Sequence, residues 1–177
     1  MNLKKKFWGF FCVLVCMFLV TMGGCKKSSE AEMVPVAALL QNNYDCKQFQ
    51  ANTSTPMDGY AADQHEYCID YQYNGNNTLT LTHINAGFNC CPGEISADIQ
   101  FNGNIVTITE REQEQGCKCL CLFDLDYEIA NLAPGEYTLR IIEPYIEGND
   151  QVLEFTLQLQ SATSGSFCLP RNDYPWQ

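Results

Sequence analysis

Basic side chains are scarce in this chain of 177 residues. Lysine and arginine number 10 together against 21 aspartates and glutamates, so the formal net charge at pH 7 is −11. Nucleic-acid binding depends mainly on contacts between basic side chains and phosphates, and a surface this acidic repels phosphate backbones. We therefore expect no nucleic-acid partner.

Common catalytic and metal-binding motifs are absent as well. The sequence has no G-x-S-x-G elbow, no C-x-x-C pair and only two histidines, His65 and His83. Ser166 lacks the flanking residues of a nucleophile turn. His83 is in phase with Leu79 and Leu81 on the inward face of a strand, which favours a buried histidine bonded to a backbone carbonyl over a general base. We expect a protein without cofactor that is not an enzyme, and keep a hydrolase built around His83 as a third hypothesis.

The beginning of the sequence is typical of an export signal. Lys4, Lys5 and Lys6 precede an apolar run from Phe7 to Met22, which is slightly shorter than the about 20 residues that a membrane-spanning helix needs. The next residues, Gly23-Gly24-Cys25, resemble the lipobox of bacterial lipoproteins, whose cysteine receives a diacylglycerol after the preceding peptide is removed. This predicts a signal peptide over 1–24, followed by a lipidated Cys25 and a tether over 25–33.

The cysteine count fits such an exported chain. Of the 11 cysteines, Cys12 and Cys16 lie in the apolar run and Cys25 would carry the lipid. The eight that remain are Cys46, Cys68, Cys90, Cys91, Cys117, Cys119, Cys121 and Cys168. Because their number is even and an exported chain meets an oxidising compartment, we expect all eight to form disulfides. Removal of the three lysines would also change the formal charge to about −14.

From Glu66 onward the apolar residues follow a period of two, which is typical of strands with one buried face. Turn residues divide this part into about seven expected strands, at 66–74, 78–86, 94–101, 105–112, 117–129, 136–144 and 151–160. The first four form two hairpins. The pattern predicts one antiparallel β-sandwich over 34–177, with an irregular segment at 34–65 and a C-terminal tail pinned by Cys168.

The triplet Cys117, Cys119 and Cys121 shares a face of its expected strand with Phe123 and Leu125, so its thiols should point toward the core. Alternate residues on a strand lie roughly 6.6 to 6.8 Å apart, which is too far for the triplet to pair internally. We expect Cys90 and Cys91 each to reach one cysteine of the triplet. The alternative is a thiolate metal site or redox centre formed by these five cysteines.

Acidic residues alternate on the opposite face of the same strand. Asp124, Asp126 and Glu128 project from it, and Glu110, Glu112 and Glu114 lie upstream. Calcium loops gather their ligands on a curved backbone with glycine, whereas these residues are on an extended segment. We therefore expect a solvated face rather than a metal site.

Two resemblances complete the sequence evidence. The stretch NLAPGEYTLRI, at 131–141, resembles a segment of immunoglobulin-like and prealbumin-like sandwiches. The lipobox, FNCCPGEI, CKCLCLFDLDYEI and RIIEPY together resemble a set of short cysteine-rich bacterial lipoproteins of uncharacterised function, over most of Asn77 to Tyr145. This resemblance implies a shared sandwich domain and a place in the cell envelope, facing the periplasm or the cell surface, and transfers no catalytic residue.

Taken together, the sequence predicts a lipid-anchored envelope protein that acts as a binding or structural module. Its contacts would be the membrane, through the N-terminal lipid, and a protein or glycan partner. The alternative function is the thiolate metal-binding or redox protein described above.

Overall fold

A computed structural model describes residues 34–40, 45–47, 65–113, 117–146, 151–160 and 163–172. All of them belong to one compact unit, Met33–Gln177. The expected signal peptide, Cys25 and the tether lie outside the described residues. Among those described, no helix is long and apolar enough to cross a membrane.

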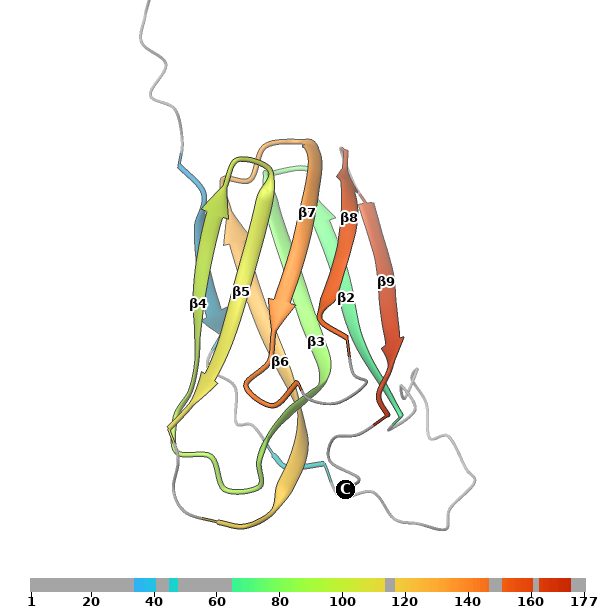
Figure 1. The fold of residues 1–177 in the computed structure, drawn as a ribbon. Coiled ribbons are helices and arrows are strands. Elements are labelled where there is room, and N and C mark those ends of the chain that lie inside the picture. Colours follow the sequence, from blue (N-terminus) through green and yellow to red (C-terminus); the bar gives the residue numbers. More distant parts are fainter. Residues whose placement is uncertain are drawn as a thin grey trace, which may run out of the picture. The chain divides into compact units, whose positions relative to one another are not determined.

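The described chain folds into two β-sheets packed face to face (Figure 1). The strands are β1 (Val36–Leu40), β2 (Glu66–Asn74), β3 (Thr78–Asn89), β4 (Ile95–Asn102), β5 (Ile105–Glu112), β6 (Leu120–Ala130), β7 (Gly135–Ile142), β8 (Leu153–Leu159) and β9 (Thr163–Pro170). One sheet has the order β1-β6-β3-β2-β9 and the other β4-β5-β7-β8. All pairings are antiparallel except that of β5 with β7.

Alternation along the strands places the core between the two sheets. On β3, Leu79 and Leu81 are buried, whereas Thr80 between them is exposed. The same alternation on β5 buries Val106 and Ile108. Because side chains of a strand point to opposite faces in turn, these residues fill the space between the sheets and their neighbours form the outer faces. The all-β, disulfide-stabilised sandwich expected from the sequence is thus confirmed, as are the two hairpins β2–β3 and β4–β5.

Two strands were not expected. Val36–Leu40 lies within the segment predicted to be irregular, but it pairs with β6 at the edge of the larger sheet. The C-terminal tail predicted from Phe167 onward instead begins within a strand, Thr163–Pro170, which pairs with β2 over its whole length. Both predictions were wrong because neither segment shows a clear period of two, and each is held as a strand by its neighbour.

A β-bulge interrupts β3 where it crosses the core. The register with β6 shifts between His83 and Ala86, so the bulge adds one residue to β3. Asn85 has a φ of 62°, a backbone conformation that asparagine tolerates better than most residues. Its backbone N–H donates to Asp124, and its side-chain amide accepts from Lys47 and donates to the Glu66 carbonyl. The bulge therefore has hydrogen-bond partners on three neighbouring segments.

All eight expected cysteines are paired in four disulfides. Cys46–Cys121 attaches the short segment 45–47 to β6, and Cys68–Cys168 joins β2 to β9. At one end of the sandwich, Cys90–Cys119 and Cys91–Cys117 connect the end of β3 to the residues before β6. Cys90 and Cys91 thus each reach one cysteine of the triplet, as the sequence indicated.

The expected orientation of the triplet was only partly right. Cys121 is buried, but Cys117 and Cys119 are exposed and precede the strand, because β6 begins at Leu120. Leu122, in phase with Asp124 on β6, is buried, and its carbonyl accepts a hydrogen bond from the backbone N–H of Lys47. The segment carrying Cys46 therefore lies beside β6 at this point, joined to it by this backbone hydrogen bond and by the disulfide Cys46–Cys121.

Loop length predicts which disulfide stabilises the domain most. Cys68 and Cys168 are 100 residues apart, and Cys90 and Cys119 are 29 apart. Because a crosslink that closes a longer loop removes more entropy from the unfolded chain, Cys68→Ala/Cys168→Ala should lower the free energy of unfolding by about 1 kcal/mol more than Cys90→Ala/Cys119→Ala. Urea unfolding of the two double variants measures the difference. Equal losses would contradict the expectation.

Candidate functional site

The two sheets are joined internally by a cluster of buried charges. His83 on β3 lies between two carboxylates: its Nδ1 is 2.7 Å from Glu110 Oε1, and its Nε2 is 3.1 Å from Glu143 Oε1. Arg171, directly after β9, donates from one terminal nitrogen to both Glu143 oxygens at 2.8 and 3.1 Å. The side chains of all four residues are at most 2% exposed.

The charges are divided between the sheets by sign. His83 and Arg171 belong to the larger sheet, whereas Glu110 on β5 and Glu143, directly after β7, belong to the smaller one. Glu110 and Glu143 follow the last pair of the parallel β5–β7 ladder, Thr109 and Ile142. The two acids therefore project inward side by side and meet the two bases from the facing sheet.

Neutral groups complete the cluster. The hydroxyl of Tyr127 donates to Glu110 Oε1 at 2.7 Å, and the backbone carbonyl of Asn85 accepts from Arg171 at 2.8 Å. The Arg171 guanidinium also lies 4.4 Å from the centre of the Tyr67 ring, a cation–π contact. A buried charge is tolerated only when it is paired and hydrogen-bonded, and each of the four charged side chains has at least one such partner.

The carboxylates set the protonation state of His83. Burial lowers the pKa of this imidazole, but the charges and hydrogen bonds of Glu110 and Glu143 outweigh burial and raise it to about 9. For Glu143, burial raises the pKa, but His83 and Arg171 outweigh this effect and lower it below its ordinary value. At neutral pH the pair is therefore an imidazolium and a carboxylate.

This geometry limits the chemistry available to the cluster. Because both ring nitrogens of His83 face carboxylates and the side chain is fully buried, a substrate has no access to either nitrogen. A depression of about 430 Å³ lies beside the cluster and includes Glu110 and Glu143 in its lining, but not His83. The arrangement therefore disfavours a hydrolase built around His83.

A metal ion would meet opposing charges here. His83, Glu110 and Glu143 offer ligand atoms within 4.8 Å of one another, and Glu110 Oε2 accepts no hydrogen bond. However, the imidazolium and the Arg171 guanidinium already neutralise the two carboxylates. A divalent cation would have to displace the His83 proton and lie near the guanidinium, so the cluster fits an ion-pair network better than a metal site.

Two sequence-based expectations were wrong at this cluster. His83 is buried as expected, but it contacts carboxylates rather than a backbone carbonyl. Glu110 was assigned to a solvated face but is 2% exposed. Its phase with Val106 and Ile108 on β5 was the signal that could have revealed this position. Asp124 and Glu128 are exposed as expected, and Asp124 pairs with Lys47; Glu114 lies outside the described residues.

The cysteines that could have formed a thiolate site are oxidised in this structure. Cys90, Cys117 and Cys119 have sulfurs within 4.8 Å of one another, and Glu66 lies similarly close to Cys68 and Cys168. Every one of these sulfurs belongs to a disulfide. Because metals bind thiolates rather than disulfide sulfurs, these clusters can bind a metal only after reduction.

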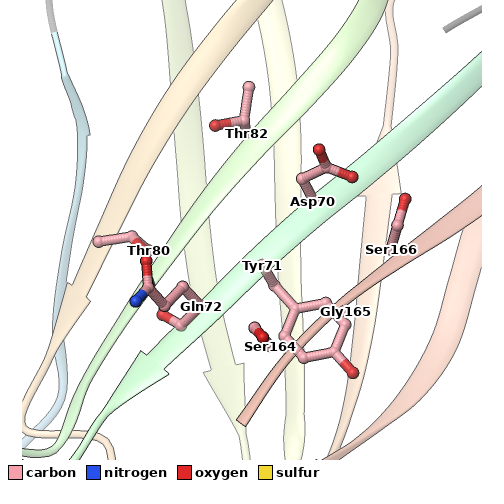
Figure 2. Close-up of a pocket in the computed structure, with 8 residues that line it drawn as sticks. All are labelled: Asp70, Tyr71, Gln72, Thr80, Thr82, Ser164, Gly165 and Ser166. Atoms are coloured by element: carbon pink, nitrogen blue, oxygen red, sulfur yellow. Dashed lines mark hydrogen bonds between the residues drawn. The ribbon is translucent and has the colours of Figure 1, made fainter. Parts of the chain in front are cut away.

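Another hollow is a polar groove on the outer face of the five-stranded sheet (Figure 2). It measures about 610 Å³ and crosses three adjacent strands, β3, β2 and β9. We call it the outer groove, and its lining residues are Asp70, Tyr71, Gln72, Thr80, Thr82, Ser164, Gly165 and Ser166. Only Ser166 among them was considered from the sequence, and for a different role.

Strand register brings the polar side chains of the outer groove together. Asp70 is paired with Thr82 on one side and Ser166 on the other, and Gln72 is flanked by Thr80 and Ser164. Figure 2 shows Asp70 projecting between Thr82 and Ser166. Cys68 and Cys168 lie two residues from Asp70 on β2 and from Ser166 on β9, and their disulfide crosslinks the same pair of strands. The groove is therefore built on strands whose register is fixed covalently.

The fold and these two sites define a disulfide-stapled β-sandwich with an internal charge cluster and an external polar groove. No protein-family model, curated protein or solved structure matches the chain. The resemblance to cysteine-rich bacterial lipoproteins therefore stays a prediction from the sequence motifs.

Removing one charge from the cluster should be costly. In Glu143→Gln, the imidazolium and the guanidinium would lose a buried counter-charge, so we expect a loss of about 3–5 kcal/mol in the free energy of unfolding. Glu154→Gln is the matched control, because Glu154 forms a surface pair with Arg140 and should lose less than about 1 kcal/mol. Urea unfolding compares both variants, and similar losses would contradict a structural role for the cluster.

The raised pKa of His83 also predicts a pH dependence of stability. Its folded pKa of about 9 exceeds the ordinary value of 6.5, so the stabilisation is complete below pH 6.5 and is lost as pH rises through 9. The full effect is on the order of 3 kcal/mol. Stability measured from pH 6 to 10 should therefore fall more steeply in the wild type than in His83→Gln.

An NMR titration of the wild-type histidines tests the same prediction without a variant. The His83 ring should stay protonated at pH 7.5. If it loses its proton near pH 6.5, the proposed ion pair with the two carboxylates is wrong.

Proposed function

We propose that this protein is a lipid-anchored β-sandwich of the bacterial cell envelope, that it acts as a non-enzymatic binding module, and that the outer groove is its binding surface. The observation that carries the binding role is the set of polar side chains in this groove. The side chains of Asp70, Gln72 and Ser164 make no hydrogen bond within the described part of the chain. They can bond to a ligand without breaking an internal contact.

The distribution of polar groups between the two sheet faces supports a binding role over catalysis. The buried titratable groups are inside the sandwich, where they bond to each other. The outer groove instead offers neutral hydroxyl and amide groups and a single carboxylate, Asp70. Such groups bind and orient a ligand, whereas nucleophilic catalysis requires an activated nucleophile beside a base.

Rigidity of the scaffold supports the same proposal. The groove lies on strands rather than on loops, and β9, its outer wall, is held by Cys68–Cys168 and by the buried Arg171 at its end. A surface fixed in advance loses little conformational entropy when it binds. The disulfides would also keep the domain folded outside the cell, where the proposed lipid anchor would place it.

The lipid anchor rests on Gly23-Gly24-Cys25 and is tested separately. Expressed in a bacterium, the wild-type protein should partition into the detergent phase of a Triton X-114 extract and carry an acylated Cys25 in mass spectra. Cys25→Ser should lose both properties, because thioether formation requires the sulfur. Cys12→Ser is the matched control, since Cys12 lies in the segment expected to be removed. A wild-type protein without acyl chains would refute the anchor.

A further inference from the structure

The side chains of the outer groove offer hydrogen bonds of both kinds on a hollow surface. Threonine and serine hydroxyls donate and accept, the Gln72 amide does both, and the Asp70 carboxylate accepts. Thr80 donates to the backbone carbonyl of Gln72 at 3.2 Å and Thr82 to Asp126 at 2.7 Å. Even so, both hydroxyl oxygens retain the capacity to accept from a ligand.

The charge of this face excludes several ligand classes. Asp70 is the one charged residue of the lining, and two further acids, Asp126 and Glu128 on β6, are the register partners of Thr82 and Thr80. No arginine or lysine belongs to the lining. Phosphate, sulfate and carboxylate groups would therefore be repelled, which leaves neutral or cationic ligands.

The shape and polarity of the groove favour a small polar ligand over a protein partner. Protein interfaces usually have an apolar core with large aromatic or arginine anchors. The groove has one aromatic residue, Tyr71, and its ring is turned toward Phe155 of β8, with ring centres 6.3 Å apart. A volume of about 610 Å³ is within the range of small-molecule sites and accommodates a few sugar rings.

We propose that the outer groove binds a neutral oligosaccharide, and this inference rests on the binding role proposed above. Adjacent hydroxyls of a sugar ring form pairs of donors and acceptors, and a planar carboxylate or carboxamide can bond to two of them at once. Asp70 and Gln72 are two residues apart on β2 and point to the same face, so they lie about 6.6 to 6.8 Å apart along the strand. Hydroxyls of β3 and β9 flank them on both sides.

Gly165 shapes the outer wall of the groove. A Cβ atom at this position would lie 2.7 Å from the Tyr71 hydroxyl and 2.9 Å from the ring, closer than real Cβ contacts. The glycine thus allows the Tyr71 ring to lie against β9, with the Tyr71 hydroxyl next to Gly165 (Figure 2). Because the Tyr71 ring packs toward Phe155 of β8, we expect binding to depend on hydrogen bonds rather than on stacking of a sugar on an aromatic face.

The proposal is tested by titrating the purified oxidised domain with neutral hexasaccharides of glucose, mannose, xylose and N-acetylglucosamine, using NMR and calorimetry up to millimolar concentrations. Hexagalacturonate and a heparin hexasaccharide are the anionic counterparts, and calcium chloride tests a cation. We expect at least one neutral hexasaccharide to bind, with shifts confined to β2, β3 and β9. The anionic sugars should bind at least about 10-fold more weakly, because of the acidic residues of this face.

Paired variants locate the site. Asp70→Asn and Gln72→Ala should each weaken binding about 3- to 10-fold, as expected for the loss of one or two hydrogen bonds. Asp98→Asn and Gln100→Ala are the matched controls, because these exposed residues occupy outward positions of β4 on the other sheet. They should leave the affinity unchanged.

Several outcomes would overturn the proposal. Absence of binding by all the neutral sugars, equal loss in groove and control variants, preference for the anionic sugars, or binding of calcium alone would each do so. None of these results concerns acylation of Cys25, so a failure of the glycan proposal and a failure of the lipid anchor are distinguishable. If the groove instead bound a peptide or protein, and Gln72→Ala weakened that binding, the proposed binding role would hold but the proposed glycan class of the ligand would be refuted.

Discussion

The contact of the His83 imidazolium and the Arg171 guanidinium with Glu143 is the interaction on which the rest of the structure depends. The bases come from one sheet and the acid from the other, so the interaction resists separation of the two layers. Apolar attraction is non-directional, whereas a buried ion pair with several hydrogen bonds is favourable only in a narrow range of geometries. We infer that the cluster fixes how the sheets are placed against each other.

The same cluster links the interior to the outer groove through β9. This strand is at the edge of the described sheet and pairs only with β2, so it has half of the ladder contacts of a central strand. Cys168 and Arg171, near its C-terminal end, supply a covalent bond to β2 and a buried ion pair with Glu143. Ser164 and Ser166 therefore owe their position to bonds made by other residues of the same strand.

Much of the fold could be predicted from the sequence because it depends on a local pattern. Strands with one buried face, such as β3 and β5, alternate clearly, and residues such as Leu79, Leu81 and His83 were placed correctly on the inner face. The edge strands β1 and β9 were missed, since VAALL has no alternation and TSGSFCLP is small and polar at its start. Their structure comes from pairing with β6 and β2, which a local pattern does not contain.

The sites were harder to predict because they are made by register rather than by motif. Glu110 lies in an acidic stretch that resembles a solvated face, and its role depends on His83 of the facing sheet, which the packing of the two sheets brings close. The outer groove likewise has no motif: Asp70, Thr82 and Ser166 become neighbours only when β2, β3 and β9 align. In this sandwich, alternation along the strands directs one set of side chains, which includes the buried charged residues, to the interior. The other set, which includes the hydroxyls of the outer groove, lies on the surface. A shift of β2 by one residue would exchange the side chains on its two faces, so the disulfide beside the groove holds the register on which the proposed binding surface depends.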